Sequence, residues 1–360
     1  MVKVIAEAGV NHNGSLDLAL ELTEVAAKAG ACAVKFQTFK AEQVATKAAE
    51  KASYQKQSTG NSGSQLDMLR SLELKKEWHK ELSELAVKLG MEFMSTPFDE
   101  DSLRFLVDEV GVKTLKIPSG EITNAPLLLE FARSDCELIL STGMSSMAEV
   151  EEAVSLLGWA MAFPERQPSS RKEFQEAWRT PEIFDLLKSR LTVLHCTSQY
   201  PAPPEFVDLK AMQAMKERLQ LPVGYSDHTQ GQNIAVAAVA TGASVIEKHF
   251  TLDCSMDGPD HQASLEPEPL AQMITAVREV DLAMGDGVKA MQACEKDTAL
   301  VARRSLVARR ALKAGDVIGC ADLGVMRPGT GINPMNYWDV AGSSVKEDIL
   351  ENDLITSGAI

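Results

Sequence analysis

Residues 2–30 read VKVIAEAGVNHNGSLDLALELTEVAAKAG, and this stretch carries the pattern that decides the fold. Val2–Ala6 is a short, mainly apolar run with two valines and an isoleucine, which predicts a buried strand. Ser15 is the expected N-cap of a helix whose apolar face ends at Gly30, a typical C-cap residue. A second strand is expected at Ala33–Gln37. The chain therefore begins with a β-α-β unit, whose strands lie parallel.

The same alternation continues along most of the 360 residues. Further strands are expected at 91–95, 114–117, 137–141, 191–196, 222–225 and 244–250, and helices at 75–89, 147–157, 209–219, 233–241 and 267–284. Eight such units in about 285 residues match the number and size of a closed (β/α)₈ TIM barrel. A doubly wound open sheet is the other architecture that this pattern allows.

Two segments interrupt the alternation, and the pattern changes near the C-terminus. Residues 38–71 form a long polar stretch, and a loop of this length is typically a lid or a binding loop. Residues 158–180 are expected to form an insertion without a catalytic role. We predict a barrel over residues 1–287, a linker over 288–299 and a small, mostly-β domain over 300–360, with short strands at 305–308, 317–318 and 324–326.

The composition argues against several classes of protein. The chain has 36 Lys and Arg against 51 Asp and Glu, a formal charge of −15, so nucleic acid and an anionic membrane are not expected partners. No apolar stretch is long enough to span a membrane, and no targeting segment is expected. The six cysteines are scattered without paired spacing, which favours reduced thiols and a cytoplasmic location.

Polar side chains stand at or near the ends of all eight expected strands, where a TIM barrel gathers its functional groups. Lys35, Lys116 and Glu247 lie inside strands that should be apolar, which is unfavourable unless these residues are paired or used. Such a complete ring of polar residues predicts an enzyme. In chain order the ring contains Glu7, Lys35, Gln37, Thr96, Lys116, Ser119, Ser141, Tyr200, Ser226, His228, Glu247 and His249.

The lysines of this ring stand near several hydroxyl groups. Lysine ammonium groups and hydroxyl donors together suit a ligand that carries both phosphate and carboxylate. The hydroxyls come from Thr96, Ser119, Ser141 and Ser226. The alternative is that Lys35 and Lys116 are ion-paired residues with a structural role only.

Two histidines, His228 and His249, close adjacent strands of the same ring. Two imidazoles with Glu7 or Glu247 nearby suit a divalent metal ion with open coordination positions, although a single histidine more often has a structural role. The consecutive residues 226–228, Ser-Asp-His, do not predict a hydrolase triad, because adjacent residues of a strand point to opposite faces.

Nine motifs, in order over nearly the whole chain, resemble the sialic acid synthase family. The small C-terminal domain is similar to type III antifreeze protein, as a SAF domain is. The motifs are AEAGVNHNG (6–14), VKFQT (34–38), STPF (95–98), LKIPSGE (115–121), STGM (141–144), GYSDHT (224–229), IEKHF (246–250), GPDH (258–261) and RPGTG (327–331).

The resemblance implies an enzyme that condenses phosphoenolpyruvate with N-acetylmannosamine and water to give N-acetylneuraminate and phosphate. A legionaminate synthase that uses 2,4-diacetamido-2,4,6-trideoxymannose is the alternative within the family. Two alternatives from other classes are a Schiff-base aldolase that uses Lys35 or Lys116, and a non-catalytic sugar-binding module.

The resemblance also implies roles for individual residues. His228 and His249 would bind Mn²⁺ or Mg²⁺, and Glu7 would lie beside the reacting carbons, so that Glu7, Lys35 and Glu247 are the candidate catalytic residues. Phosphoenolpyruvate would be held by Thr96, Lys116, Ser119, Ser141 and Ser226. The sugar would be held by Lys35, Gln37, Tyr200, Glu247 and Asp260.

Arg327 would reach the N-acetyl group of the sugar from the small domain of a partner subunit, within a domain-swapped homodimer. A solvated arginine in a turn is the other interpretation of this residue. Residues 195–200 depart from the family pattern, in which an asparagine often stands near positions 197–198.

Overall fold

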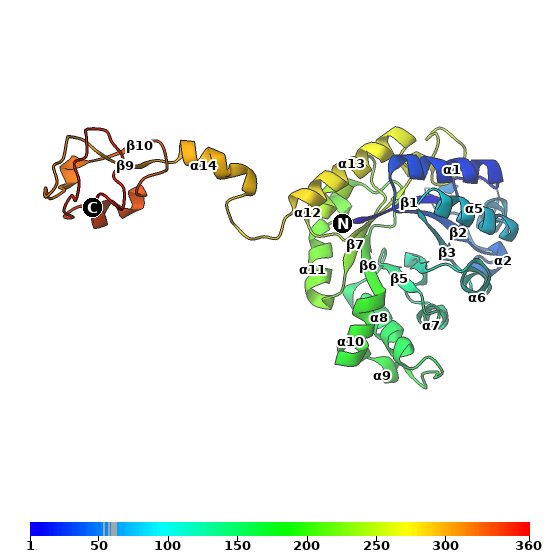
Figure 1. Ribbon diagram of the computed structural model, residues 1–360. Helices are drawn as coiled ribbons and strands as arrows, with labels where there is room; N and C mark the ends of the chain where they lie inside the picture. Colours follow the sequence, from blue (N-terminus) through cyan, green and yellow to red (C-terminus); the bar gives the residue numbers. More distant parts are fainter. Residues whose placement is uncertain (53–54, 57, 59–62) are drawn as a thin grey trace. The chain divides into compact units, whose positions relative to one another are not determined.

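The computed structural model describes residues 1–52, 55–56, 58 and 63–360. Its first eight strands are all parallel and follow one another in chain order around a closed barrel (Figure 1). Since β1 pairs with β8, the expected TIM barrel is confirmed and the open sheet is wrong. The strands are β1 (Lys3–Gly9), β2 (Ala33–Thr38), β3 (Glu92–Pro97), β4 (Thr114–Ile117), β5 (Glu137–Ser141), β6 (Leu191–Cys196), β7 (Val223–Asp227) and β8 (Val245–His249).

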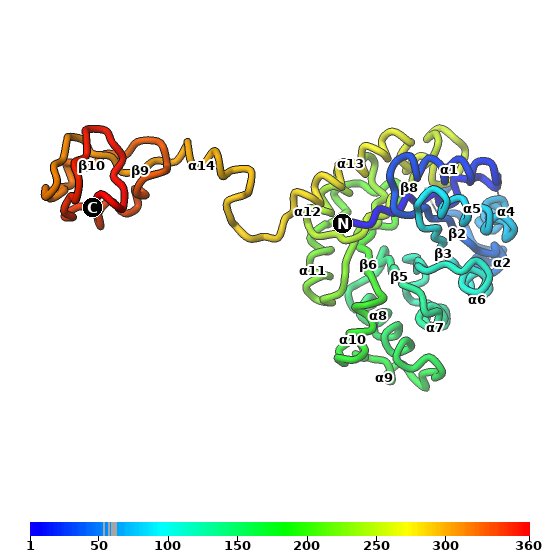
Figure 2. Tube along the Cα trace, viewed as in Figure 1, coloured from blue at the N-terminus to red at the C-terminus, as the bar shows by residue number. Residues whose placement is uncertain are grey.

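Helices surround the barrel on its outside, as the Cα trace in Figure 2 shows. In the barrel part of the chain they are α1 (Leu16–Ala29), α2 (Ala41–Val44), α4 (Gln65–Ser71), α5 (Lys76–Lys88), α6 (Glu100–Phe105), α7 (Ala125–Arg133), α8 (Met147–Ala162), α9 (Arg171–Phe174), α10 (Pro181–Arg190), α11 (Leu209–Leu219), α12 (Asn233–Ala240) and α13 (Pro267–Ala283).

The first β-α unit forms as its sequence predicts. The Ser15 hydroxyl accepts a hydrogen bond from the backbone of Leu18 and so caps α1. At the other end, Gly30 has a φ of 88° and its N–H bonds the carbonyls of the last turn. Leu22 and Ala26, on the apolar face of the helix, are fully buried against the barrel.

The interior of the barrel is built in layers. An apolar cluster forms the lower layer. Two positions after each of its residues, the same strand carries a polar residue of the predicted site or, on β6, Cys196. Because residues i and i+2 of a strand face the same side, this spacing places a polar layer directly on an apolar floor. The pairs are Ile5 and Glu7, Ala33 and Lys35, Met94 and Thr96, Ile139 and Ser141, Leu194 and Cys196, and Val245 and Glu247.

The insertion expected at residues 158–180 begins later than predicted. Helix α8 does not end at residue 157 but continues to Ala162. Gly158, the first residue of the expected insertion, lies in a helix contact: a Cβ atom there would stand 2.6 Å from Ile183 Cγ2 on α10. Further along, Phe174 and Trp178 are buried in the main core. The segment is therefore part of the packed structure of the barrel domain.

The chain divides into two compact units, Met1–Gly285 and Asp286–Ile360. The second unit contains α14 (Lys296–Ala302), the antiparallel strands β9 (Ser305–Ala308) and β10 (Leu323–Met326), and α15 (Tyr337–Val340). Its separate core includes Leu306, Leu312, Ile318 and Ile349. The strand expected at residues 317–318 is wrong, because Val317 makes only an isolated bridge to Ser344.

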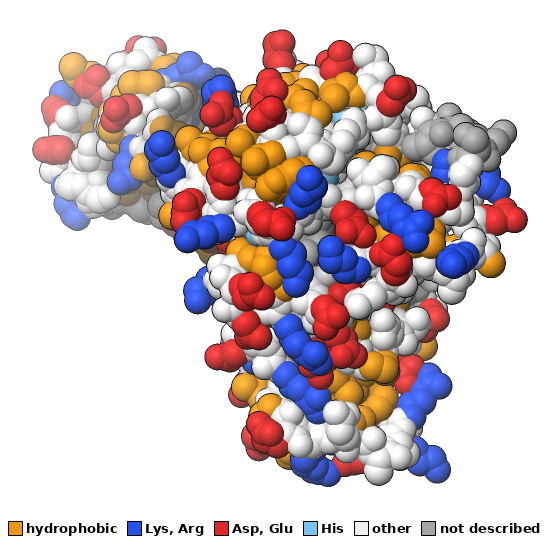
Figure 3. All heavy atoms as spheres, turned by 90° about the vertical axis from the view of Figure 1, so that its right-hand side faces the viewer, with side chains coloured by type: hydrophobic (Ala, Val, Ile, Leu, Met, Phe, Trp, Pro, Cys, Tyr) orange, Lys and Arg blue, Asp and Glu red, His pale blue; other side chains and the backbone are white. Residues whose placement is uncertain are grey.

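Acidic and basic side chains are interspersed over the face of the molecule that Figure 3 shows. Within the described part of the chain, no helix is both long enough and apolar enough to cross a membrane.

Gly224 of β7 tests the packing of the barrel interior. A Cβ atom at this position would collide with the carbonyl oxygen of Val245 and would lie 2.6 Å from Leu194 Cδ2. We expect Gly224→Ala to lower the free energy of unfolding by about 1–3 kcal/mol, because backbone cannot move away as a flexible side chain can. Urea denaturation measures this change. Gly120→Ala, where nothing lies within 4 Å of the added methyl, is the matched control, and equal stability of the two variants would contradict the prediction.

Candidate active site

A cavity of about 420 Å³ lies over the polar layer, at the carboxyl ends of the barrel strands. Gln55 and Met68 from the long 38–71 segment line part of the wall, as does Leu72, which directly follows it, so this segment borders the cavity as a binding loop would. The predicted site residues in its lining are Glu7, Lys35, Gln37, Thr96, Lys116, Ser119, Ser141, Tyr200, Ser226, His228, Glu247, His249 and Asp260.

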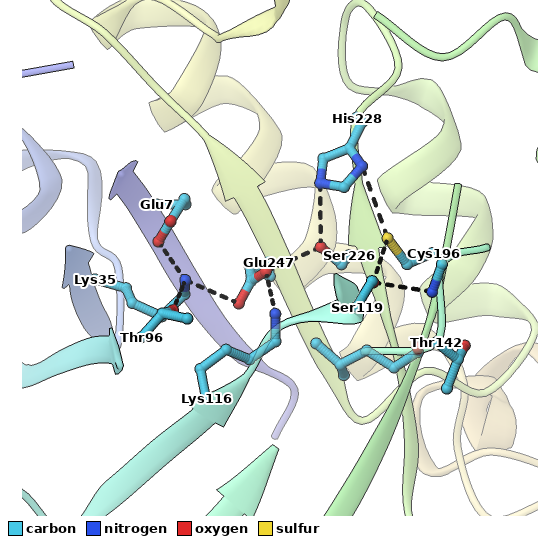
Figure 4. A network of polar contacts seen from close by, with 12 residues as sticks. Glu7, Lys35, Thr96, Lys116, Ser119, Thr142, Cys196, Ser226, His228 and Glu247 are labelled. Atoms are coloured by element: carbon cyan, nitrogen blue, oxygen red, sulfur yellow. Dashed lines mark hydrogen bonds and ion pairs between the residues drawn. The ribbon is translucent and has the colours of Figure 1, made fainter. Parts of the chain in front are cut away.

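Four charged side chains form a network on the cavity floor (Figure 4). Lys35 Nζ lies 2.6 Å from Glu7 Oε2 and 3.6 Å from Glu247 Oε2. Lys116 Nζ donates a 2.9 Å hydrogen bond to the other oxygen of Glu247. All four side chains are at least 95% buried. Lys35 and Lys116 are thus ion-paired, as the structural alternative expects, but their ion pairs line the cavity itself. Two positive and two negative charges balance each other there.

The two carboxyl groups of this network have opposite electrostatic environments. Burial raises the pKa of Glu7 to about 7, and Glu247 adds to this effect, although Lys35 opposes it. Burial also disfavours the charge of Glu247, but Lys116 and Lys35 outweigh burial and hold its pKa well below the usual range. Two carboxyl groups whose pKa values are pushed apart in this way can take different roles in one reaction.

Hydroxyl groups surround Lys116 on one side of the cavity. The Ser141 hydroxyl is buried and has no hydrogen-bond partner among the described residues. The Ser119 hydroxyl accepts a 2.9 Å hydrogen bond from the backbone of Gly143, and the Ser226 hydroxyl donates to Glu247. Thr96 accepts a hydrogen bond from Lys35. The unpartnered Ser141 hydroxyl is the clearest sign that this side receives a polar ligand.

His228 and His249 face the same cavity, with ring centroids 5.5 Å apart. His228 Nδ1 lies 2.8 Å from the carbonyl oxygen of Thr197 and donates to it, so the lone pair of the neutral ring is on Nε2. His249 Nδ1 is buried without a hydrogen-bond partner among the described residues. Burial, together with His228, holds the pKa of His249 well below its ordinary value, which keeps that ring neutral.

These two imidazoles fit a divalent metal ion. Neutral imidazole nitrogens are common ligands of such ions, and the hydrogen bond from His228 Nδ1 is the kind that orients a ligating ring. Asp260 Oδ2 lies 3.9 Å from His249 Nδ1, and burial raises the pKa of Asp260 to about 6. Among the described residues, no group of three His, Cys, Asp or Glu side chains is arranged to hold a metal ion. The protein would therefore supply only two strong ligands.

The rest of the cavity lining combines polar and apolar groups. Gln37 Nε2 donates to Glu7 Oε1 at 3.3 Å, and the Tyr200 ring lies against His228 with centroids 4.1 Å apart. An apolar cluster forms the wall at the carboxyl ends of β1 to β3. It consists of Val10, Phe39, Met68 and Leu72, with Leu69 and Phe98 packed against it. Such a wall suits a ligand that carries methyl groups as well as polar ones.

Segment 195–200 contains a site residue that the sequence interpretation did not select. Cys196 lies in the cavity lining, with its Sγ atom 3.7 Å from both Ser119 Oγ and His228 Nδ1. The i, i+2 alternation from Leu194 was the signal that could have identified it. Thr197 contributes its backbone carbonyl to His228 rather than a side chain. His195, one position out of phase, bonds the carbonyl of Val207 instead.

The predicted separation of residues 226–228 is confirmed. Asp227 is fully buried and pairs with Lys248, whereas Ser226 and His228 both line the cavity. Arg327 is the one predicted site residue outside the barrel unit. It is exposed and follows β10 in the second unit, within the RPGTG turn.

The raised pKa of Glu7 predicts how stability depends on pH. Because the folded pKa of about 7 exceeds the ordinary value of 4.5, the folded state binds the extra proton between these pH values. The free energy of unfolding should therefore fall as the pH rises from 4.5 to above 7.

We expect Glu7→Gln to remove the part of this dependence that Glu7 contributes, so that wild type loses about 3 kcal/mol relative to the variant between pH 4.5 and 8. Urea denaturation of both proteins over this range measures the difference. Parallel stability curves for the two proteins would mean that Glu7 is not protonated in the folded state near neutral pH.

Comparisons with known proteins agree with this site. The chain is 46% identical to the N,N'-diacetyllegionaminic acid synthase of Campylobacter jejuni over 352 residues, which is 98% of each chain. It is also 46% identical to the enzyme of the same name from Legionella pneumophila, over 96% of this chain and 91% of that one. Among solved structures, the N-acetylneuraminic acid synthetase of Leptospira borgpetersenii in complex with citrate is 34% identical, with a TM-score of 0.65 over 82% of this chain and 90% of that one.

Two conserved-domain matches cover nearly the whole chain. Residues 303–359 match the SAF domain, as the resemblance to antifreeze protein implied. Residues 22–289 match the NeuB family and include all the strands of the barrel but the first. The chain is therefore a member of the NeuB family, with a C-terminal SAF domain.

Proposed function

We propose that this chain is a nonulosonate synthase that condenses phosphoenolpyruvate with an N-acetylated mannosamine-type sugar and water. C3 of phosphoenolpyruvate forms a bond with the aldehyde carbon of the open-chain sugar, water adds at C2, and the C–O bond to phosphate breaks. The observation that carries the proposal is the cavity floor. Two buried lysines and an unpartnered serine hydroxyl lie there, and the imidazoles of His228 and His249 line the same cavity.

The lysine and hydroxyl side of the cavity would bind phosphoenolpyruvate. Lys116 and the Ser141 hydroxyl are the donors best placed for its anionic groups, with Ser119, Ser226 and Thr96 beside them. Charge-assisted hydrogen bonds of this kind are about twice as strong as neutral ones. Binding requires Lys116 to share its ammonium hydrogens between Glu247 and the ligand, which keeps that carboxylate in contact with a positive charge.

Glu7 would lie beside the carbon atoms that react. When C3 attacks the aldehyde, positive charge develops at C2, and a fixed carboxylate nearby stabilises it. Lys35, at 2.6 Å, holds the Glu7 carboxylate in place. Mn²⁺ or Mg²⁺ held by His228 and His249 would act as a Lewis acid toward the aldehyde oxygen. Lys35, Gln37, Tyr200, Glu247 and Asp260 would bind and orient the sugar.

The surroundings of Lys35 oppose the Schiff-base alternative. Burial alone would lower the pKa of Lys35, but Glu247 and Glu7 outweigh burial and raise it above the ordinary value. A Schiff base requires a neutral amine, which an enzyme obtains by lowering the pKa of its lysine. Lys35 is therefore suited to hold charge and not to act as a nucleophile.

The similarities to known enzymes favour legionaminate synthase over N-acetylneuraminate synthase. Two relatives at 46% identity are N,N'-diacetyllegionaminic acid synthases, whereas the N-acetylneuraminic acid synthetase is 34% identical. The apolar wall of the cavity agrees with a substrate that has a second acetamido group and a methyl group at C6. We therefore propose 2,4-diacetamido-2,4,6-trideoxymannose as the substrate, ahead of N-acetylmannosamine.

Two expectations from the family resemblance complete the proposal. We propose that the enzyme is a domain-swapped homodimer, and that Arg327 contacts the N-acetyl group of a sugar bound to the partner subunit. Exposure of the Arg327 side chain is compatible with that role but also with a solvated turn. The support for both expectations is the resemblance of the RPGTG motif.

A phosphate-release assay with a panel of sugars tests the proposal. With phosphoenolpyruvate and Mn²⁺ present, we expect kcat/KM for 2,4-diacetamido-2,4,6-trideoxymannose to exceed that for N-acetylmannosamine by at least tenfold. EDTA should abolish phosphate release, and metal should restore it. Sugar binding without phosphate release would favour the non-catalytic module, and a borohydride-trapped adduct would favour the aldolase. A preference for N-acetylmannosamine would reinstate the original expectation.

Lys116→Ala tests the assignment of the phosphoenolpyruvate side. Loss of a buried charge-assisted contact to an anion typically costs about 2–5 kcal/mol, so KM for phosphoenolpyruvate should rise well over tenfold. KM for the sugar should change much less in the same steady-state measurements. Lys113→Ala, which removes an exposed lysine just before β4, is the control and should leave both constants unchanged. Equal effects of Lys116→Ala on the two substrates would place Lys116 outside the phosphoenolpyruvate site.

A further inference from the structure

An ion pair that the proposed reaction does not use lies next to the two histidines in the sequence. Lys248 Nζ is 2.9 Å from Asp227 Oδ2, and both side chains are 0% exposed. The two residues are register partners on the neighbouring strands β7 and β8. Because adjacent residues of a strand point to opposite faces, this pair points away from the cavity that His228 and His249 line.

The hydrogen bonds of this pair enclose the backbone of His228. Asp227 Oδ1 accepts hydrogen bonds from the backbone N–H of Thr229 at 2.9 Å and from its hydroxyl at 2.8 Å. Lys248 also donates to the backbone carbonyl of Thr229. One side chain of β8 thus holds the residue before His228 and the residue after it. The same lysine directly precedes His249 in the chain.

We propose that Asp227, Thr229 and Lys248 are positioning residues that fix the spacing and orientation of His228 and His249 for a divalent metal ion. The inference rests on the proposed function, through its metal site. Stability alone does not require such a pair, since apolar residues of similar volume often stabilise a core equally well. A hydrogen-bonded ion pair is directional, however, and it fixes the relation of two strands more closely than apolar side chains do.

A double variant separates positioning from stability. Asp227→Leu combined with Lys248→Met removes both charges and leaves apolar side chains of similar size, so no unpaired charge stays buried. The measurement is Mn²⁺ affinity of the full-length protein, followed by the electron paramagnetic resonance signal of free Mn²⁺. We expect affinity to fall about 10–100-fold, as for other groups that orient metal ligands, while the thermal midpoint of the metal-free protein stays within a few degrees of wild type.

The control is a buried hydroxyl of the same kind on another strand. Thr38 bonds His79 at 2.8 Å and Ser95 at 2.7 Å, outside the cavity. Thr38→Val should lower stability and leave Mn²⁺ affinity unchanged. If the double variant does not fold, Thr229→Val serves instead, since it removes only the hydroxyl bond to Asp227, and we expect at least threefold weaker Mn²⁺ binding.

The outcomes distinguish this inference from the proposed function. If wild type binds Mn²⁺ and the variants bind it equally tightly, the positioning role is overturned and the metal site is not. A wild type that binds no Mn²⁺ would overturn the metal site of the proposed function, and the positioning role with it.

Discussion

The four buried charges of Glu7, Lys35, Lys116 and Glu247 form the interaction on which the rest of the site depends. Each would be strongly unfavourable in the barrel interior alone, and removal of any one leaves a partner uncompensated. When both carboxyl groups are ionised, the four charges sum to zero and the network then offers no net positive charge to an anion, and the whole chain is acidic. An anionic substrate must instead be recognised by hydroxyl donors and by lysine hydrogens that are shared with the carboxylates.

The layered interior explains why this network can exist. The apolar floor from Ile5 to Val245 seals the barrel below it, and the helices seal it from outside. In that environment burial holds Glu7 partly protonated near neutral pH, whereas the two lysines keep Glu247 ionised. A carboxyl group held in this state lowers the stability of the folded protein at neutral pH, as is common where a functional group must stay reactive.

The strand period also separates two tasks within the same pair of strands. On β7 and β8 the residues facing inward serve the cavity, and the residues between them form the Asp227–Lys248 pair. The two sets are continuous in sequence, so a motif such as SDH or EKH contains residues of the cavity and a residue of the buried ion pair together. This arrangement accounts for a fully buried ion pair in a position where apolar residues would pack equally well.

The sequence by itself determined the closed barrel, the small second domain and most of the candidate residues that line the cavity, because strand periodicity and strand ends are local features. Strands β4, β5 and β6 and helix α11 match their predicted bounds. The local sequence pattern could not predict which side chains contact each other across the barrel. Which lysine meets which carboxylate, the unpartnered hydroxyl of Ser141 and the contact of Cys196 with His228 all depend on strands that close the barrel. Gly158 illustrates the same limit: its sequence suggested a helix end, but contact with α10 made it the point where two helices approach each other.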